Sequence, residues 1–107
     1  MKASGKHTVV YTTFPDTRTA RRIVNGLVAR QLIACGSIFK IFSIYRWQGK
    51  IERSQEYGAL IKTTRRKYRA VEKYIKEKHP YDVPEIICWD IAAGQADYLA
   101  WLSDAAG

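Results

Sequence analysis

The hydrophobic positions in the first third of the chain predict a strand followed by an amphipathic helix. Residues 7–13 are mostly β-branched or aromatic, which is typical of a strand. Pro15 interrupts that pattern, and Asp16 is a residue type favoured at a helix N-cap. From there apolar residues recur three and four positions apart, with arginines between them. This spacing predicts a helix over 17–31.

The middle of the chain predicts a hairpin that is too long for a domain of this size. Residues 34–47 and 50–63 are typical of strands, and Gln48-Gly49 between them is typical of a tight turn. Fourteen extended residues would span about 45 Å. A compact domain of this length has a radius of gyration of about 13 Å. We therefore expect the hairpin to bend or to project, and its exposed aromatic residues to need a partner, most simply a second copy of the chain.

The last third of the chain predicts a helix, a short strand and a final helix. The second helix is expected to be capped by Thr63 or Thr64, and it ends at His79-Pro80, because a residue before proline resists helical geometry. Residues 85–91 are apolar enough for a strand buried on both faces. A last helix opens at Gly94 and uses three apolar side chains for packing: Tyr98, Trp101 and Leu102.

The element order βαββαβ with an added C-terminal helix predicts the ferredoxin-like class of α+β sandwich, as one domain over 1–107. In that topology the strands of Cys35 and Cys88 lie at opposite edges of the sheet. Their Cα atoms would be farther apart than the limit of about 7 Å for a disulfide. Both cysteines are therefore expected to be free thiols.

Composition narrows the classes of partner. The net charge of +8 favours anionic partners, with nucleic acid as one class, although a solvated basic surface is the simpler interpretation. An RNA-recognition fold shares the βαββαβ order, but residues 56–62 match only a fragment of its third-strand motif. No apolar stretch is long enough for a membrane helix, and the first residues resemble no secretory signal, so we expect a cytoplasmic protein.

Six segments, taken in order, resemble the CutA divalent-cation tolerance family, and together they span nearly the whole chain. They are Tyr11-Thr12-Thr13-Phe14-Pro15-Asp16, Leu32-Ile33-Ala34-Cys35, Ser43-Ile44-Tyr45-Arg46-Trp47-Gln48-Gly49-Lys50-Ile51-Glu52, Ile61-Lys62-Thr63, His79-Pro80-Tyr81-Asp82-Val83-Pro84-Glu85-Ile86-Ile87 and Tyr98-Leu99-Ala100-Trp101-Leu102. The resemblance implies a ferredoxin-like protomer, a homotrimer, and a role in the response to copper and other divalent ions. It also implies kinship in fold with the trimeric PII-type signalling proteins.

The chain departs from some bacterial members of that family at two positions. Thr12 stands where those members have a cysteine, and Lys78 stands where they have a second histidine. A threonine hydroxyl does not replace a thiolate for copper, and a lysine ammonium is not a ligand. We therefore expect weak binding of Cu(II) or another divalent cation, with His79 as the candidate metal ligand.

Five further residues are candidates for an interface or a ligand cleft: Tyr45, Trp47, Lys50, Glu52 and Tyr81. The aromatic ones are equally typical of packing anchors between subunits. Glu52, Asp82 and Glu85 could each offer a carboxylate oxygen to a divalent ion. In the alternative interpretation, Glu52 pairs across strands and Glu85 holds the start of a strand. Lys50 and Lys62 could bind an anion in such a cleft, or they could simply be solvated charges on the surface of the hairpin. No nucleophile with a base and no phosphate-binding loop occurs, so we expect a binding or signalling protein rather than an enzyme.

Overall fold

The computed structural model describes residues 6–107. The absence of a secretory signal was inferred from the first residues of the chain, and of these, residues 1–5 lie outside the described part. Four strands and three α-helices follow one another as the sequence predicts, with a short 3-10 helix, η2, before the second α-helix. The elements are β1 (His7–Phe14), α1 (Thr17–Ala29), β2 (Cys35–Trp47), β3 (Lys50–Thr64), η2 (Arg65–Lys67), α2 (Tyr68–Lys78), β4 (Ile86–Asp90) and α3 (Ala96–Ala105).

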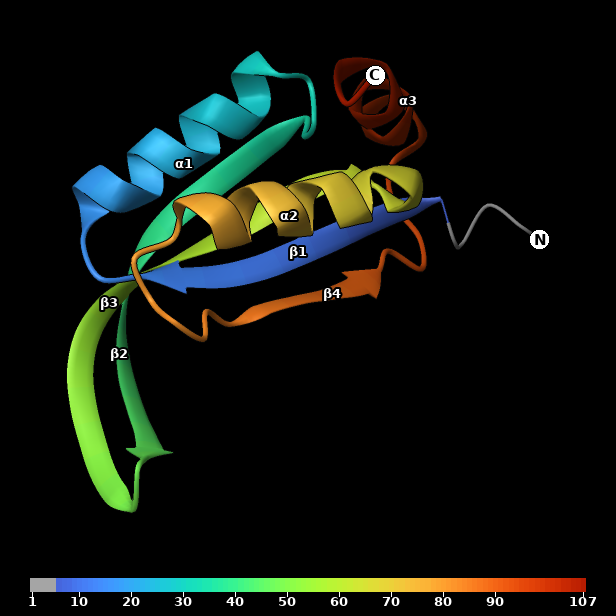
Figure 1. Cartoon of the computed structure of the whole chain (residues 1–107). Helices are drawn as coiled ribbons and strands as arrows, with labels where there is room; N and C mark the ends of the chain where they lie inside the picture. Colours follow the sequence, from blue (N-terminus) through green and yellow to red (C-terminus); the bar gives the residue numbers. More distant parts are fainter. Residues whose placement is uncertain (1–5) are drawn as a thin grey trace.

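The four strands form one antiparallel sheet in the order β2-β3-β1-β4. This order confirms the predicted ferredoxin-like topology. Helices α1 and α2 lie side by side over one face of the sheet (Figure 1). The strands of Cys35 and Cys88 are the two edge strands, as predicted, and both residues are free thiols.

The hydrophobic core lies between that face of the sheet and the two helices. Alternate residues of β1, Val10 and Phe14 among them, point into it and are fully buried, as the two-residue period of a strand requires. Helix α1 adds its apolar stripe, and Asp16 caps it by accepting a hydrogen bond from the backbone N–H of Thr19 at 2.7 Å. The other fully buried large side chains of the core are Ile23, Leu27, Ile33, Ile61, Val71 and Ile75.

The β2–β3 hairpin continues well beyond the rest of the sheet and bends away from it (Figure 1). The molecule measures 44 × 27 × 22 Å as a result. Gln48 and Gly49 both take positive φ angles, as the tight turn between the strands requires. Phe42 and Ile44 on this ribbon are 66% and 63% exposed. The prediction of a projecting apolar ribbon is confirmed.

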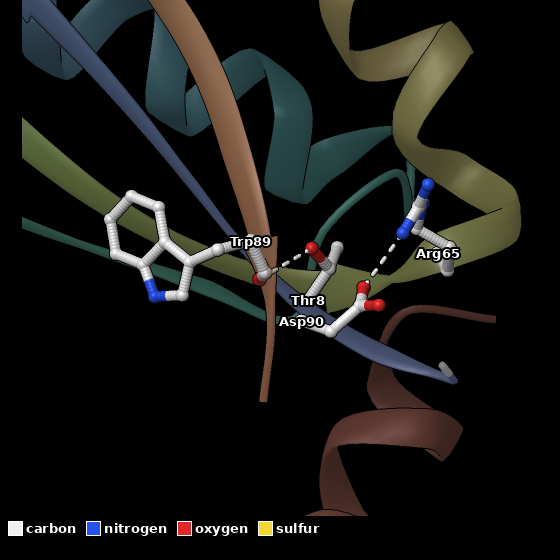
Figure 2. A network of polar contacts seen from close by, with 4 residues as sticks. All are labelled: Thr8, Arg65, Trp89 and Asp90. Atoms are coloured by element: carbon white, nitrogen blue, oxygen red, sulfur yellow. Dashed lines mark hydrogen bonds and ion pairs between the residues drawn. The ribbon is translucent and has the colours of Figure 1, made fainter. Parts of the chain in front are cut away.

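Strand β4 differs from the prediction of burial on both faces. The side chains of Ile87 and Trp89 are about half exposed. The reason is that β4 is an edge strand, and no helix of the described residues 6–107 covers the face opposite α1 and α2 at this position. The hydroxyl of Thr8 donates to the backbone carbonyl of Trp89 at 2.8 Å, and the Asp90 side chain forms an ion pair with Arg65 at 2.8 Å (Figure 2).

The helix ends also differ in detail from the prediction. Helix α1 ends at Ala29 instead of residue 31, because Gln31 takes a left-handed backbone conformation. Thr64 makes no side-chain cap, and the 3-10 helix η2 intervenes before α2. Helix α3 is capped by Gln95 instead of Gly94.

The packing of α3 rests on fewer side chains than predicted. Leu102 is fully buried, whereas Tyr98 and Trp101 are exposed. The imidazole of His7 lies 2.9 Å from the Ser103 hydroxyl and joins α3 to the start of β1. None of the helices within residues 6–107 has the length and apolar character that spanning a membrane requires.

Candidate functional site

A cleft of about 590 Å³ opens where the β2–β3 ribbon leaves the sheet. The end of β1, the ribbon and the loop after α2 form its walls. This placement follows from the fold, because the ribbon bends beside the point where both β1 and α2 end. The lining residues are Thr13, Ser43, Ile44, Tyr45, Trp47, Glu56, Tyr81, Asp82, Val83 and Glu85.

His79 fixes the loop that forms one wall of this cleft. Helix α2 stops before Pro80, and the His79 ring turns inward and stacks on Phe14, with 5.1 Å between the ring centroids. Nδ1 accepts the backbone N–H of Tyr81 at 3.1 Å, so the proton is on Nε2, which donates to the Thr13 carbonyl at 2.7 Å. Burial lowers the pKa of His79 and favours this neutral form.

Glu56 and Tyr81 form a hydrogen-bonded pair inside the cleft. The Tyr81 hydroxyl donates to Oε1 of Glu56 at 3.0 Å, and Glu56 is only 6% exposed. Burial, and then the neighbouring Glu56 carboxylate, raise the pKa of Tyr81 well above its ordinary value. Burial with the charges of Glu85 and Glu56 also raises the pKa of Tyr11. The electrostatic environment here is negative.

The charge of the cleft is opposite to that of the chain. Its ionisable lining residues are three acids, Glu56, Asp82 and Glu85, and two tyrosines. No lysine or arginine lines it within residues 6–107, although the chain carries a net charge of +8. Aromatic walls beside carboxylates favour a cationic ligand over an anionic one.

The structure brings three of the predicted cleft residues together and leaves two outside. Tyr45, Trp47 and Tyr81 line the cleft. Lys50 and Glu52 do not line it; they lie at the ribbon tip, directly across the strand pair from Trp47 and Tyr45. Of the two candidates for an anion site, Lys62 is also remote, because it pairs with Cys35 and donates to the Ser37 hydroxyl at 3.4 Å.

Sequence reasoning missed Glu56, the most buried acid of the cleft. A signal was present, because Glu56 directly precedes the apolar run of residues 57–61. A carboxylate in a strand that enters a core needs a partner, and Tyr81 supplies it. Thr13, Ser43 and Ile44 were missed as well, and nothing in their local pattern marks them.

The candidate metal ligand His79 has both ring nitrogens occupied by the hydrogen bonds described above. Binding a metal through either nitrogen would require one of these bonds to break. Among residues 6–107, no group of three or more histidine, cysteine, aspartate and glutamate side chains converges in a way that could hold a metal ion.

Comparison with known proteins supplies the family. The family model described as CutA1 divalent ion tolerance protein matches residues 8–105. The Divalent-cation tolerance protein CutA of Pyrococcus horikoshii is 45% identical over 94 residues, which are 88% of this chain and 92% of that protein. The Thermus thermophilus protein of the same name is 42% identical over 100 residues, 92% of this chain and 97% of its own length.

Solved structures agree with this match. The crystal structure of CutA1 from Pyrococcus horikoshii has a TM-score of 0.88 at 42% identity and covers 92% of this chain and 96% of its own. A structure from Archaeoglobus fulgidus, described as a periplasmic divalent cation tolerance protein CutA, has a TM-score of 0.92 at 34% identity. The match covers 94% of this chain and 99% of that one. The chain belongs to the CutA family of divalent-cation tolerance proteins.

Proposed function

We propose that this CutA-family chain works as a homotrimer that binds divalent cations weakly in the acidic cleft, and that it acts by binding rather than by catalysis. The observation that carries the proposal is the charge of the cleft. Three carboxylates gather there with no basic side chain among the described lining residues, on a chain of net charge +8. A cation in this cleft therefore meets favourable charge although the chain as a whole is positive.

The donor set indicates which cations fit. Carboxylate oxygens suit hard ions such as Mn²⁺, and Cu²⁺ binds them as well because of its general affinity for oxygen and nitrogen sites. Glu56, Asp82 and Glu85 would supply the oxygens. The affinity is expected to be low, because these carboxylates do not converge as a set of three ligands. Both cysteines lie outside the cleft lining, so no thiolate contributes.

The trimer is supported by the apolar surface that one chain leaves in water. Phe42, Ile44, Trp47 and Ile51 are exposed on the ribbon, and Ile87 and Trp89 are exposed on β4. Exposed apolar surface of this kind marks a protein interface. Light scattering at low micromolar concentration should give about three times the chain mass of 12.3 kDa. A stable monomer would remove this part of the proposal.

Calorimetric titration with Mn²⁺ and Cu²⁺ tests the site. Glu56→Gln keeps an acceptor for Tyr81 but removes a charge from the cleft, so we expect at least about tenfold weaker binding. Glu52→Gln is the matched control, because Glu52 lies on the same strand outside the cleft. Unchanged affinity in Glu56→Gln, together with a loss in His79→Gln, would move the site to His79.

A further inference from the structure

The net positive charge of the molecule comes from its helical layer, defined here as residues 17–30 and 65–78. The first segment carries four arginines and no acid, and the second carries seven basic residues against two acids. Together they have a net charge of +9, one more than the whole chain, so the remainder is slightly acidic. Helices α1 and α2 of this layer lie side by side on one face of the sheet (Figure 1).

Nearly all of this charge faces water. Lys67 is half-buried, and the other ten basic side chains are exposed: Arg18, Arg21, Arg22, Arg30, Arg65, Arg66, Arg69, Lys73, Lys76 and Lys78. Within the described residues, only Arg65 of this set forms an ion pair, with Asp90. The two acids of the layer are Glu72 and Glu77, and Glu72 accepts a hydrogen bond from the Tyr68 hydroxyl. The layer therefore presents a dense array of cations with few neutralising groups.

One contact between the helices holds like charges together. Gly26 of α1 allows Tyr74 of α2 to approach closely, because a Cβ at position 26 would overlap the Tyr74 hydroxyl. The guanidinium carbon of Arg30 lies 5.0 Å from the centre of the Tyr74 ring, and Nζ of Lys78 lies 5.7 Å from it. A cation from the end of α1 and one from the end of α2 thus lie near the same ring, and a bound anion would offset their mutual repulsion.

The chemistry of the layer selects among anionic partners. Seven of the eleven basic residues are arginines, whose planar fork matches phosphate oxygens. Val28 is the only exposed large apolar side chain of the layer, so a lipid surface would find little to bury. The two tyrosines of the layer, Tyr68 and Tyr74, are half-buried, so no exposed aromatic ring is offered for stacking on single-stranded bases.

We infer that the helical layer binds the phosphate backbone of double-stranded nucleic acid without reading its sequence. A duplex presents closely and regularly spaced negative charge and hides its bases, which matches a surface of arginines without exposed rings. The basic side chains of this layer do not line the acidic cleft. This inference is therefore independent of the proposed cation binding.

Fluorescence anisotropy on the full chain with two unrelated duplexes of about 20 base pairs tests the inference. We expect equal affinities for the two sequences. If six or more phosphates are contacted, the affinity should fall by about a thousandfold or more between 50 and 200 mM salt. The variant Arg69→Gln/Lys73→Gln/Lys76→Gln removes an exposed stripe of α2, at helical spacing i, i+4 and i+7. Its logarithmic salt slope should drop by roughly one for each contact removed.

The matched control is Arg46→Gln/Lys50→Gln/Arg53→Gln on the ribbon, where all three residues are exposed. It changes the net charge equally and should keep the parent's affinity, with light scattering checking the assembly of both variants. An equal loss in the two variants would mean that net charge alone attracts the duplex, and it would overturn the inference. So would the absence of duplex binding at 50 mM salt, a tenfold preference between sequences, or binding only to vesicles containing phosphatidylserine.

Discussion

The imidazole Nε2 of His79 lies 2.7 Å from the carbonyl oxygen of Thr13, and this bond ties the end of α2 to the end of β1. The same ring accepts the backbone N–H of Tyr81, whose hydroxyl reaches Glu56. The wall of the cleft therefore depends on a neutral, buried histidine. A second proton on the ring would need Nδ1, which is the atom that accepts from Tyr81.

Acidification should destabilise the fold through His79. Burial lowers its pKa in the folded state, so below about pH 6.5 the unfolded chain binds the proton more readily than the folded one. The stability that the neutral ring contributes is thus complete above pH 6.5 and is lost as the pH falls toward the folded-state pKa. Denaturant unfolding at pH 7.5, 6.5 and 5.5 measures this loss.

The variant His79→Gln should be less stable than the parent at pH 7.5 but should vary less between pH 6.5 and 5.5. Lys78→Gln, an exposed neighbour, is the control that should keep the parent's pH profile. A profile in His79→Gln as steep as that of the parent would assign the pH dependence to other groups.

Trp47→Ala should weaken assembly more than it disturbs the protomer. Trp47 lies next to the turn of the projecting ribbon and is 46% exposed in one chain. Truncating an aromatic anchor at an interface costs about 2 kcal/mol or more, and a closed trimer repeats the contact three times. Sedimentation velocity over a dilution series, with far-UV circular dichroism, should show dissociation with the secondary structure kept. Arg46→Ala is the adjacent control, and trimers of undiminished stability in Trp47→Ala would make this residue a cleft wall only.

Gly36→Ala should destabilise the protomer. A Cβ at position 36 would lie 2.7 Å from Cγ1 of Val24, which is buried in the core between α1 and the sheet. Overpacking of this kind costs about 1–3 kcal/mol. Ser37→Ala at the exposed neighbouring position should change the free energy of unfolding by no more than about 0.5 kcal/mol. Similar unfolding midpoints in denaturant for the two variants would show that the core accommodates the methyl group.

Leu102→Ala should release α3. Leu102 is the one buried side chain within this helix and is fully buried. Removing its branched end costs about 2–5 kcal/mol by loss of burial and the cavity left behind. Amide hydrogen exchange should then be faster across α3 than across α1. Asp104→Ala, an exposed change on the same helix, should leave the exchange of α3 slow, and an α3 still protected in Leu102→Ala would mean that the His7–Ser103 contact is enough to hold it.

The fold could be predicted in detail because its signals are local. The two-residue period of residues 7–13, the cap at Asp16 and the turn at Gln48-Gly49 each act within a few positions. The prediction was wrong where the burial of a side chain depends on neighbouring elements in space. Residues 85–91 are apolar and so predicted a strand buried on both faces, yet an edge position leaves Ile87 and Trp89 exposed.

The candidate site could be predicted only in part. Tyr45, Trp47 and Tyr81 were found as aromatic residues in segments resembling the CutA family, and they do meet in the cleft. Lys50 and Glu52 belong to the same segment but lie beyond the cleft at the ribbon tip, because the ribbon carries successive residues away from the sheet. Glu56 was missed because its partner Tyr81 lies 25 residues away along the chain.

The sequence by itself determined the elements, their order and their family, because hydrophobic period, caps and turns act between residues that are neighbours in the chain. The tertiary structure decided the character of the surfaces. Only folding brings Glu56, Asp82 and Glu85 to one cleft, engages both nitrogens of His79, and places two basic helices on the same face. Electrostatic fields and hydrogen bonds depend on distance in space, and the bend of the ribbon and the antiparallel sheet set those distances.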